Sequence, residues 1–277
     1  MPNSDGSTEP TWRLLRVGCD ASLSDLIAEM LWSAGVQAVE EISADAGEVV
    51  LRTYTTSEVL PGLLRRHFPG ITVEHEDIAV AVADTWRAHV SATPIGGGHW
   101  IVPAWCDAPP GGESIFIEPG ATFGLGDHPT TVLALRLALA RCVPGEKVHD
   151  HGTGSGVLAV ALTRWRGAVC SVDDIAPEAL SAVEDNARRN GVGCPLWIDG
   201  LPGGTACVDA VVANILAPVL RTDARRIVEV VKVGGWIVLS GMRADQMEDV
   251  LGHYEGCEEI DRSSLEGWTA VTLRRVA

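Results

Sequence analysis

The alternation of apolar and polar positions at the front of the chain predicts a small domain of mixed strands and helices. Strands are expected over residues 12–18, 36–41, 48–54 and 71–76. A helix is expected over 22–35, and a second over 57–68 that is interrupted near Pro61. The order strand–helix–strand–strand–helix–strand is typical of a split βαβ, or ferredoxin-like, α+β domain, which we place at residues 12–77. The polar residues 1–11 are predicted to form a disordered tail.

From about residue 119 the pattern changes to strands that alternate with helices. We expect strands over 147–152, 168–174, 194–198, 209–214 and 235–241. Helices are expected near 130–142, 156–166, 177–190, 217–231 and 244–252. The last two strands, 257–264 and 268–275, follow one another directly and predict an antiparallel hairpin. Residues 119–277 are therefore predicted to form a doubly wound α/β sheet, joined to the front domain by a linker over 78–118 that contains a helix near 84–90 and further strands.

Composition limits the class of protein. The 277 residues are 46% hydrophobic, which is enough for one large domain or two modest ones. The sequence has no run of eighteen apolar residues, and its polar start lacks the core of a signal peptide, so a cytoplasmic protein without a membrane segment is expected. The seven cysteines are scattered without a C-x-x-C pair, which favours a reducing compartment with buried thiols. No typical zinc spacing occurs among the eight histidines, and no metal site is predicted.

The net charge of −16 is unevenly distributed. Residues 1–118 carry 17 acidic and 6 basic side chains, a net charge of −11, whereas residues 119–277 carry 20 and 15, a net charge of −5. Nucleic-acid binding depends on Lys and Arg that neutralise phosphates, and no basic patch is visible, so direct nucleic-acid binding is not expected. An acidic surface favours solubility, and it also suits a basic partner.

The segment VHDHGTGSGV, residues 148–157, predicts a ligand-binding turn between a strand and a helix. Its glycines stand at 152, 154 and 156, with Asp150 two residues before the first. The dinucleotide fingerprint requires a further glycine where this chain has Val157, which disfavours a nicotinamide-dependent oxidoreductase. A tight turn without a ligand is the structural alternative.

An acidic residue ends the next predicted strand. Asp174 lies 22 residues after Gly152 and follows Asp173. A carboxylate at this place can accept hydrogen bonds from both ribose hydroxyls of a bound nucleoside. The alternative is that these aspartates cap the helix that begins near Pro177.

The combination of D-x-G-x-G-x-G with a downstream acid resembles class I S-adenosylmethionine-dependent methyltransferases, whose cofactor has no pyrophosphate. Two further stretches, FGLGDHPTT (123–131) and VVANILAPVL (211–220), are similar to the motifs F-G-T-G-x-H-P-T-T and N-I-L-A of the PrmA family, the methyltransferases of large-subunit ribosomal protein eleven. The resemblance extends over nearly the whole chain from Trp12. It implies a class I methyltransferase fold, S-adenosyl-L-methionine as cofactor and N-methylation of a basic ribosomal protein.

Carried over position by position, the resemblance implies a set of site residues. The implied cofactor contacts are Phe123, Gly124, Thr131, Asp150, Gly152, Gly154, Gly156, Asp174, Ile175 and Asn214. Asn214 would also be catalytic, because its side-chain carbonyl could accept hydrogen bonds from the incoming amine and direct the nitrogen lone pair at the methyl group. His128 or Asp127 is a candidate base for that amine. The alternatives are that His128 only orders its loop and that Asn214 is a turn residue.

The chain also departs from the family pattern. Leu125 replaces the threonine of F-G-T-G. His149 and His151 flank Asp150; the family usually has an apolar residue at the position of His149 and a small or apolar residue at the position of His151. The front domain is acidic and has no lysine. These departures leave open another protein, a peptide or a small metabolite as the acceptor. A cofactor-binding protein without catalysis is an alternative of a different class, which the intact motifs around Gly152, Asp174 and Asn214 disfavour. The sequence does not indicate an oligomeric state.

Overall fold

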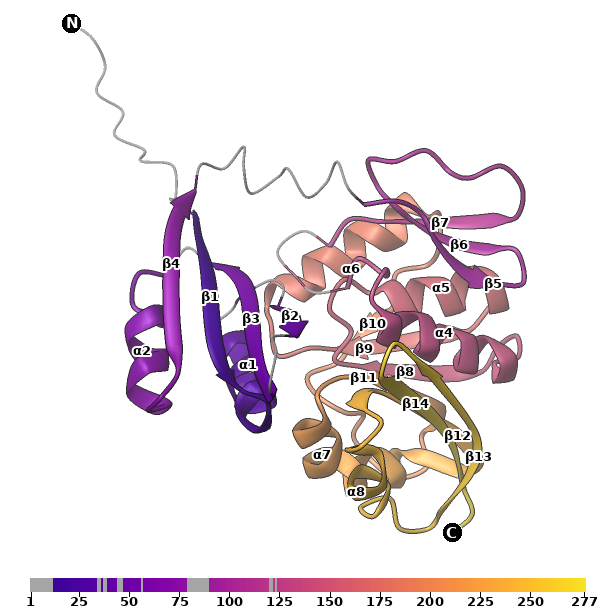
Figure 1. Cartoon of the computed structure of the whole chain (residues 1–277). Helices are drawn as coiled ribbons and strands as arrows, with labels where there is room; N and C mark the ends of the chain where they lie inside the picture. The colour runs from indigo at the N-terminus through magenta and orange to yellow at the C-terminus, as the bar shows by residue number, and fades with distance from the viewer. Residues whose placement is uncertain are drawn as a thin grey trace, which may run out of the picture. The chain divides into compact units, whose positions relative to one another are not determined.

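A computed structural model gives the arrangement of the elements (Figure 1). It describes residues 12–33, 36, 39–43, 47–55, 57–78, 90–119, 122 and 124–277. The expected tail 1–11, residues 84–89 of the expected linker helix and the candidate cofactor contact Phe123 lie outside the described residues. The chain divides into two compact units, Met1–Val90 and Ser91–Ala277.

The first unit contains an antiparallel sheet with the strand order β2-β3-β1-β4. Its strands are β1 (Trp12–Asp20), β2 (Val39–Ser43), β3 (Glu48–Thr55) and β4 (Thr72–Ile78), and its helices are α1 (Ser24–Ser33) and α2 (Leu60–His67). The two central strands, β1 and β3, are not consecutive in sequence, as in the split βαβ arrangement. The ferredoxin-like α+β fold predicted for this part is confirmed.

Helix α2 differs from its prediction at Pro61. The proline lies in the first turn of the helix and does not interrupt it. Proline is tolerated there because the first backbone N–H groups of a helix have no intrahelical acceptor. The start at Leu60 places Leu60 and Leu64 in the apolar core between helices and sheet, together with Leu15 and Ile27.

The second unit is built on a seven-stranded sheet with the order β10-β9-β8-β11-β12-β14-β13. Neighbouring strands from β10 to β12 run parallel, whereas β14 is antiparallel to β12 and to β13. The strands are β8 (Lys147–His151), β9 (Val169–Asp173), β10 (Leu196–Trp197), β11 (Val208–Asn214), β12 (Val231–Arg243), β13 (Cys257–Leu265) and β14 (Trp268–Arg275). The predicted doubly wound sheet with a C-terminal antiparallel hairpin is confirmed.

Helices cover both faces of this sheet. The apolar core on one face includes α4 (Pro129–Arg141), α5 (Val157–Arg166) and the inward side of α6 (Glu178–Arg189). The core on the other face includes α7 (Ala217–Val230) and α8 (Met247–Leu251). Because side chains alternate along a strand, Val212 faces the first core and its neighbours Val211 and Ala213 face the second.

A small three-stranded sheet precedes α4 in the second unit. It consists of β5 (Thr93–Gly96), β6 (His99–Pro103) and β7 (Glu113–Ile117), and its isoleucines are buried in the core that contains α4 and α5. Asn186 of α6 attaches the end of β7, because its side chain accepts from the backbone N–H of Glu118 and donates to the Glu118 carbonyl. The strands of the expected linker segment 78–118 therefore pack within the second unit.

Several element lengths differ from the predictions, because pairing with neighbouring strands sets them. The strand expected over 194–198 is reduced to the two residues of β10, which pair with Ser171 and Val172 at the edge of the sheet. Strand β12 extends to Arg243, and α8 is correspondingly shorter than the helix expected over 244–252. All seven cysteines are free thiols, but Cys194 is exposed, contrary to the expectation of buried thiols. Among the described residues, no helix has the length and apolar character needed to span a membrane.

Candidate active site

The predicted site residues gather where parallel strands end. The glycine loop follows β8, Asp174 follows β9, and Asn214 is the last residue of β11. From β8 the chain continues to β9 and β10 on one side of this strand and then crosses to β11 on its other side, so the direction of strand addition reverses at β8. In doubly wound sheets ligands bind at this topological switch point, outside the carboxyl ends of the strands.

The glycine loop is attached to β9 through its backbone. The N–H groups of Gly152 and Thr153 donate to the carbonyl of Asp173 at 3.1 and 2.9 Å. Gly152 and Gly156 have φ angles of 72° and 81°, a region that favours glycine. A Cβ at Gly152 would overlap Cγ2 of Ile215, and one at Gly156 would come within 3.0 Å of Val183. Both glycines are therefore required by the turn itself, and of the two Gly152 is partly exposed whereas Gly156 is buried.

Asp150 lies fully buried beside the loop. Its Oδ2 accepts from the Thr153 hydroxyl at 2.6 Å and from the Ala159 N–H at 3.2 Å. Its Oδ1 has no hydrogen-bond partner among the described residues. Burial raises the pKa of Asp150 to about 7, although both hydrogen bonds oppose this shift. The Oδ2 of Asp150 thus stabilises the turn by two hydrogen bonds, whereas its Oδ1 has no hydrogen-bond partner among the described residues.

Asp174 joins the glycine loop to the start of the next helical segment. Its Oδ2 accepts from the Gly154 N–H at 2.7 Å, and its Oδ1 accepts from the Ala176 N–H at 2.8 Å. Helix α6 has Pro177 as N-cap and no side-chain cap, so the alternative that Asp174 caps this helix is wrong. A carboxylate has about four acceptor positions, which leaves Asp174 with capacity for further donors. The adjacent Ile175 is 91% exposed.

Thr131 and Asn214, far apart in sequence, meet in this site. The Asn214 Nδ2 donates to the Thr131 hydroxyl at 3.2 Å, and Thr131 is completely buried in α4. The adjacent Thr130 carbonyl accepts from the Ser240 hydroxyl at 2.9 Å, which joins α4 to β12. Gly124 of the first loop is also held, because its carbonyl accepts from the Ser155 hydroxyl of the glycine loop. The two family-like motifs therefore adjoin the carboxyl ends of β8 and β11.

His128 is the N-cap of α4. Its Nδ1 accepts from the Thr130 N–H at 3.3 Å, and Pro129 occupies the first turn. The ring also lies edge-on to Trp268, with centroids 5.0 Å apart. Burial lowers the pKa of His128, so the neutral ring is favoured. The lone pair on Nδ1 is engaged in the cap, and the geometry supports the loop-ordering alternative for this residue.

Comparison with known proteins decides the family. The family model described as "Ribosomal protein L11 methyltransferase (PrmA)" matches residues 80–276. The ribosomal protein L11 methyltransferase of Marinobacter nauticus is 32% identical over an alignment of 298 positions, gaps included, that covers 95% of this chain and 98% of the relative. The chain belongs to the PrmA family.

Other comparisons agree with this membership. The ribosomal protein L11 methyltransferase of Pseudomonas aeruginosa is 37% identical over 213 residues, covering 74% of this chain and 72% of the relative. The crystal structure of ribosomal protein L11 methylase from Lactobacillus delbrueckii subsp. bulgaricus superposes with a TM-score of 0.61 at 26% identity, over 68% of this chain and 99% of that chain. The PrmA family and the class I methyltransferase fold predicted from the sequence are confirmed.

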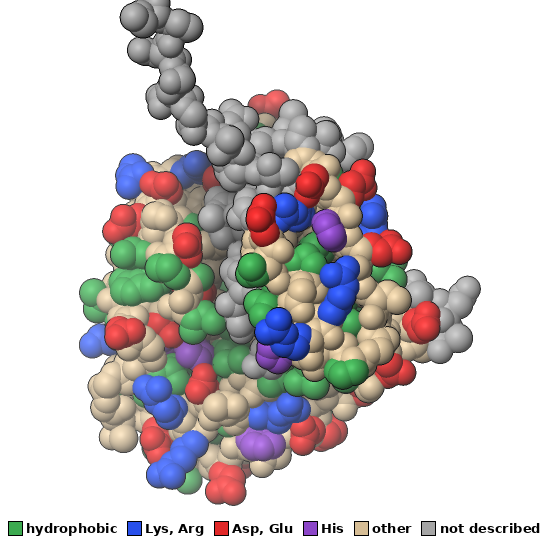
Figure 2. All heavy atoms as spheres, turned by 90° about the vertical axis from the view of Figure 1, so that its left-hand side faces the viewer, with side chains coloured by type: hydrophobic (Ala, Val, Ile, Leu, Met, Phe, Trp, Pro, Cys, Tyr) green, Lys and Arg blue, Asp and Glu red, His purple; other side chains and the backbone are tan. Residues whose placement is uncertain are grey.

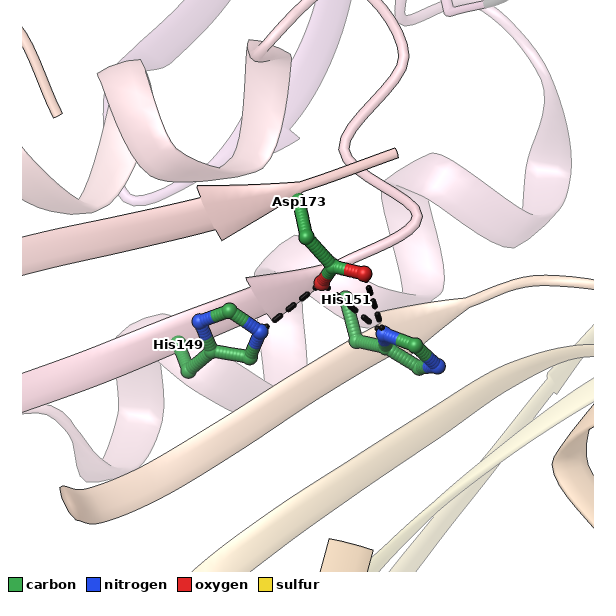
Figure 3. A group of neighbouring side chains, drawn as sticks. All are labelled: His149, His151 and Asp173. Carbon is green, nitrogen blue, oxygen red and sulfur yellow. Dashed lines mark hydrogen bonds and ion pairs between the residues drawn. The ribbon is translucent and has the colours of Figure 1, made fainter. Parts of the chain in front are cut away.

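This PrmA family member also has a largely buried polar network that the sequence pattern did not predict, and Figure 3 shows its three central side chains. We define it as five side chains in hydrogen-bonded order: Ser171, His149, Asp173, His151 and Asp223. His149 contacts Ser171 Oγ through Nδ1 at 2.9 Å and Asp173 through Nε2 at 2.8 Å. His151 contacts Asp173 through Nδ1 at 2.9 Å and Asp223 through Nε2 at 3.1 Å. The available signal was the spacing H-x-H, which places both histidines on the sheet face opposite Asp150.

The network shifts the pKa values of its members. Burial alone would raise the pKa of Asp173, but hydrogen bonds from His149 and His151 outweigh it and lower this pKa to about 2. Burial alone would lower the pKa of His151, but the carboxylates of Asp173 and Asp223 outweigh it and raise this pKa. Asp173 is therefore ionised in the folded protein at neutral pH.

Proposed function

We propose that this chain transfers methyl groups from S-adenosyl-L-methionine to amino groups of ribosomal protein L11. The observation that carries the proposal is the meeting of the glycine loop, Asp174 and the hydrogen-bonded pair Thr131–Asn214 at the carboxyl ends of β8, β9 and β11. Two relatives that match this chain carry the name of that methyltransferase. Because the proposed substrate is ribosomal, we place the reaction in the cytoplasm.

The residues present fit an S-adenosylmethionine molecule. Gly152 and Gly154 are partly exposed in the turn, so a ligand could approach its backbone there without meeting a side chain of these two residues. Asp174 would accept the ribose hydroxyls, and the exposed Ile175 beside it would cover a face of the adenine. Gly124 and Asp150 would lie beside the amino-acid end, where the Oδ1 of Asp150, which has no hydrogen-bond partner among the described residues, offers an acceptor for an ammonium group.

The bound cofactor supplies an electrophilic methyl group on a sulfonium, so this chain mainly has to position the acceptor. Asn214 donates through Nδ2 to Thr131, which fixes the plane of its amide. Its carbonyl end would then accept from the substrate amine and direct the nitrogen lone pair toward the methyl group. Thr131 is a positioning residue in this scheme, because it acts through Asn214.

The acceptor amine must lose a proton before it can attack, and a lysine amine has a reference pKa of about 10.4. A desolvated site beside a sulfonium cation would lower this value. His128 belongs to the proposed site as the residue that orders the loop before α4, since its Nδ1 accepts the first backbone N–H of that helix. We assign it no proton transfer.

The first unit offers an acidic strand to a basic substrate. Strand β4 lies at the edge of its sheet and exposes Glu74, Glu76 and Asp77. Asp77 is paired with Arg13 at 2.8 Å, and Arg16 lies 3.9 Å from Glu76. On the face drawn in Figure 2, acidic and basic side chains are interspersed among those shown in colour, without a broad patch of Lys and Arg. We propose that β4 contributes to recognition of the basic ribosomal protein.

Competition between acceptors tests the proposal. Unmethylated ribosomal protein L11 is mixed with other basic ribosomal proteins and short lysine peptides, and all share one limiting supply of labelled cofactor. We expect the label to enter L11 preferentially. Label in another acceptor would leave the methyltransferase class intact and overturn the substrate. Cofactor binding without label in any acceptor would favour a binding protein without catalysis.

A further inference from the structure

The three central side chains of the polar network have atoms that can bind a metal ion, and these atoms face one another. His149 Nε2, His151 Nδ1 and a carboxylate oxygen of Asp173 all lie within 4.8 Å of one another. Figure 3 shows the two imidazole rings on either side of the Asp173 carboxylate, each with a nitrogen turned toward it. Among the described residues, this is the group of His, Cys, Asp and Glu side chains with a spacing that could hold a metal ion.

We propose that His149, His151 and Asp173 form a binding site for a divalent first-row transition-metal ion, with Zn²⁺ as the best match. The site lies outside the cofactor-binding turn and is not part of the proposed methyl transfer. Imidazole nitrogens and a carboxylate are ligands that Zn²⁺, Fe²⁺ and Ni²⁺ accept, whereas Mg²⁺ and Ca²⁺ prefer oxygen ligands alone.

The separations between Asp173 and the two histidines require only a small adjustment, and the two ring nitrogens, which lie within 4.8 Å of each other, must also suit the ion. Zinc bonds to histidine nitrogen and carboxylate oxygen are about 2.0–2.2 Å, so two ligands of a tetrahedral ion lie about 3.4 Å apart. The present separations from Asp173 Oδ1 are 2.8 Å to His149 Nε2 and 2.9 Å to His151 Nδ1. An ion that replaces the shared protons would widen these separations by about half an ångström.

In each histidine, the ring nitrogen that does not contact Asp173 already has the hydrogen-bond partner that a metal-bound histidine needs. When one imidazole nitrogen binds an ion, the other carries a proton, and in metal sites this N–H usually donates to a carboxylate, carbonyl or hydroxyl oxygen. Ser171 Oγ lies 2.9 Å from His149 Nδ1, and Asp223 Oδ2 lies 3.1 Å from His151 Nε2. The network therefore contains ligands and supporting partners together.

The position of the site gives an ion access and a structural effect. His149 is completely buried, but the Asp223 side chain is 26% exposed, so the network reaches solvent at that end. His151 immediately precedes Gly152, and Asp173 immediately precedes Asp174. A bound ion would therefore cross-link the ends of β8 and β9, from which the glycine loop and Asp174 start.

The test uses the full chain, stripped of metal with a chelator and kept reduced with a phosphine. Co²⁺ is titrated in as a spectroscopic probe, Zn²⁺ binding is measured by calorimetry, and Mg²⁺ serves as the control ion. We expect one Co²⁺ per chain, visible ligand-field bands and no thiolate-to-cobalt charge-transfer band. We also expect Zn²⁺, but not Mg²⁺, to raise the melting temperature.

Variants assign the ion to the site. Asp173→Asn keeps the size and one oxygen acceptor but removes the anion, and we expect at least a tenfold loss of Zn²⁺ affinity. His151→Gln is a second variant with the same expected loss, in case the first does not fold. His253→Gln removes a histidine on the surface after α8 and should bind as the parent does. The proposal is overturned by absence of stoichiometric binding, by a thiolate band, or by unchanged affinity in the folded variants.

Discussion

At the scale of single residues, the site depends on side chains that hold other groups in place. Asp174 accepts from Gly154, Asn214 donates to Thr131, and His128 caps α4. Each contact either joins two segments that are distant in the chain or fixes the residue at which a helix begins. Replacing one partner therefore changes the position of the other, and the effect can be measured apart from cofactor binding.

Thr131→Val tests whether Thr131 acts through Asn214. Valine has nearly the same shape, so this completely buried position should stay packed, but the acceptor for Asn214 Nδ2 is lost. We expect kcat to fall about five- to tenfold, the equivalent of roughly one hydrogen bond, with the Kd of the cofactor within about twofold. Thr222→Val, at an exposed position of α7, is the matched control and should leave both values unchanged. A parallel rise in cofactor Kd would instead indicate direct contact between Thr131 and the cofactor.

His128→Asn separates the capping role from a role as base. Asparagine is a good N-cap but cannot accept a proton at neutral pH, so we expect most of kcat and an unchanged pH profile. His128→Ala should lower the free energy of unfolding by about 1 kcal/mol, because the cap is lost. The measurements are kcat against pH and urea unfolding. A loss of about a hundredfold in kcat for His128→Asn would show that His128 is the base.

At the scale of elements, strands β8, β11 and β12 are joined near their beginnings by Asp209. Its Oδ2 accepts from the Lys147 N–H at 2.8 Å, and its Oδ1 lies 2.6 Å from the Lys232 ammonium. The hydrogen bond from Lys232 is the main cause that lowers the pKa of Asp209, followed among the lowering contacts by the bond from Lys147. This carboxylate therefore stabilises the three strands while it is ionised.

Asp209→Asn tests this contribution and its dependence on pH. Because the folded-state pKa lies below the usual 3.8, the stabilisation is present above that value and is lost as the pH falls through the folded-state pKa. We expect the variant to lose about 1 kcal/mol at pH 7, a low figure because the pair is partly exposed, and to differ less from the parent at pH 3, which lies below the usual pKa of 3.8. Urea unfolding at both pH values measures it. Asp185→Asn, at an exposed ion pair of α6, is the control and should leave the free energy of unfolding unchanged. A loss as large as that of Asp209→Asn would show that the contacts of Asp209 contribute no more than an exposed ion pair.

Most elements of the second unit could be predicted, because their signals are local. The glycines at 152, 154 and 156, the strand–helix alternation and the final hairpin are all patterns within short stretches. The lengths of β10 and β12 depend on pairing with neighbouring strands, so the local pattern of apolar and polar residues did not predict them correctly. The polar network was missed because it joins residues 22 to 72 positions apart, which only the folded sheet brings together.

At the scale of the whole molecule, the chain combines an acidic first unit with a methyltransferase-fold second unit. Residues 1–90, which make up the first unit, carry 14 acidic and 6 basic side chains, a net charge of −8. A strongly basic protein would be attracted to such a surface, and the attraction would weaken with added salt. We propose that this attraction contributes to substrate affinity and association, whereas the chemical step depends on the second unit.

The double variant Glu74→Lys and Glu76→Lys tests this division. Both residues are exposed on β4, away from the core of the first unit. We expect KM for ribosomal protein L11 to rise about tenfold and to depend less on salt, with kcat and cofactor Kd unchanged. Glu255→Lys with Glu258→Lys makes the same charge change on the second unit and is the control. An unchanged KM, or an equal rise in the control, would contradict recognition by β4.

Methyl transfer to ribosomal protein L11 is tested most directly by the intact mass of that protein. Unmethylated L11 is incubated with S-adenosyl-L-methionine and either this chain or its Asn214→Ala variant. We predict mass gains in steps of one methyl group with the parent chain, and gains at least about a hundredfold slower with the variant. No mass gain with the parent chain, while calorimetry shows that it binds the cofactor, would contradict the proposed function.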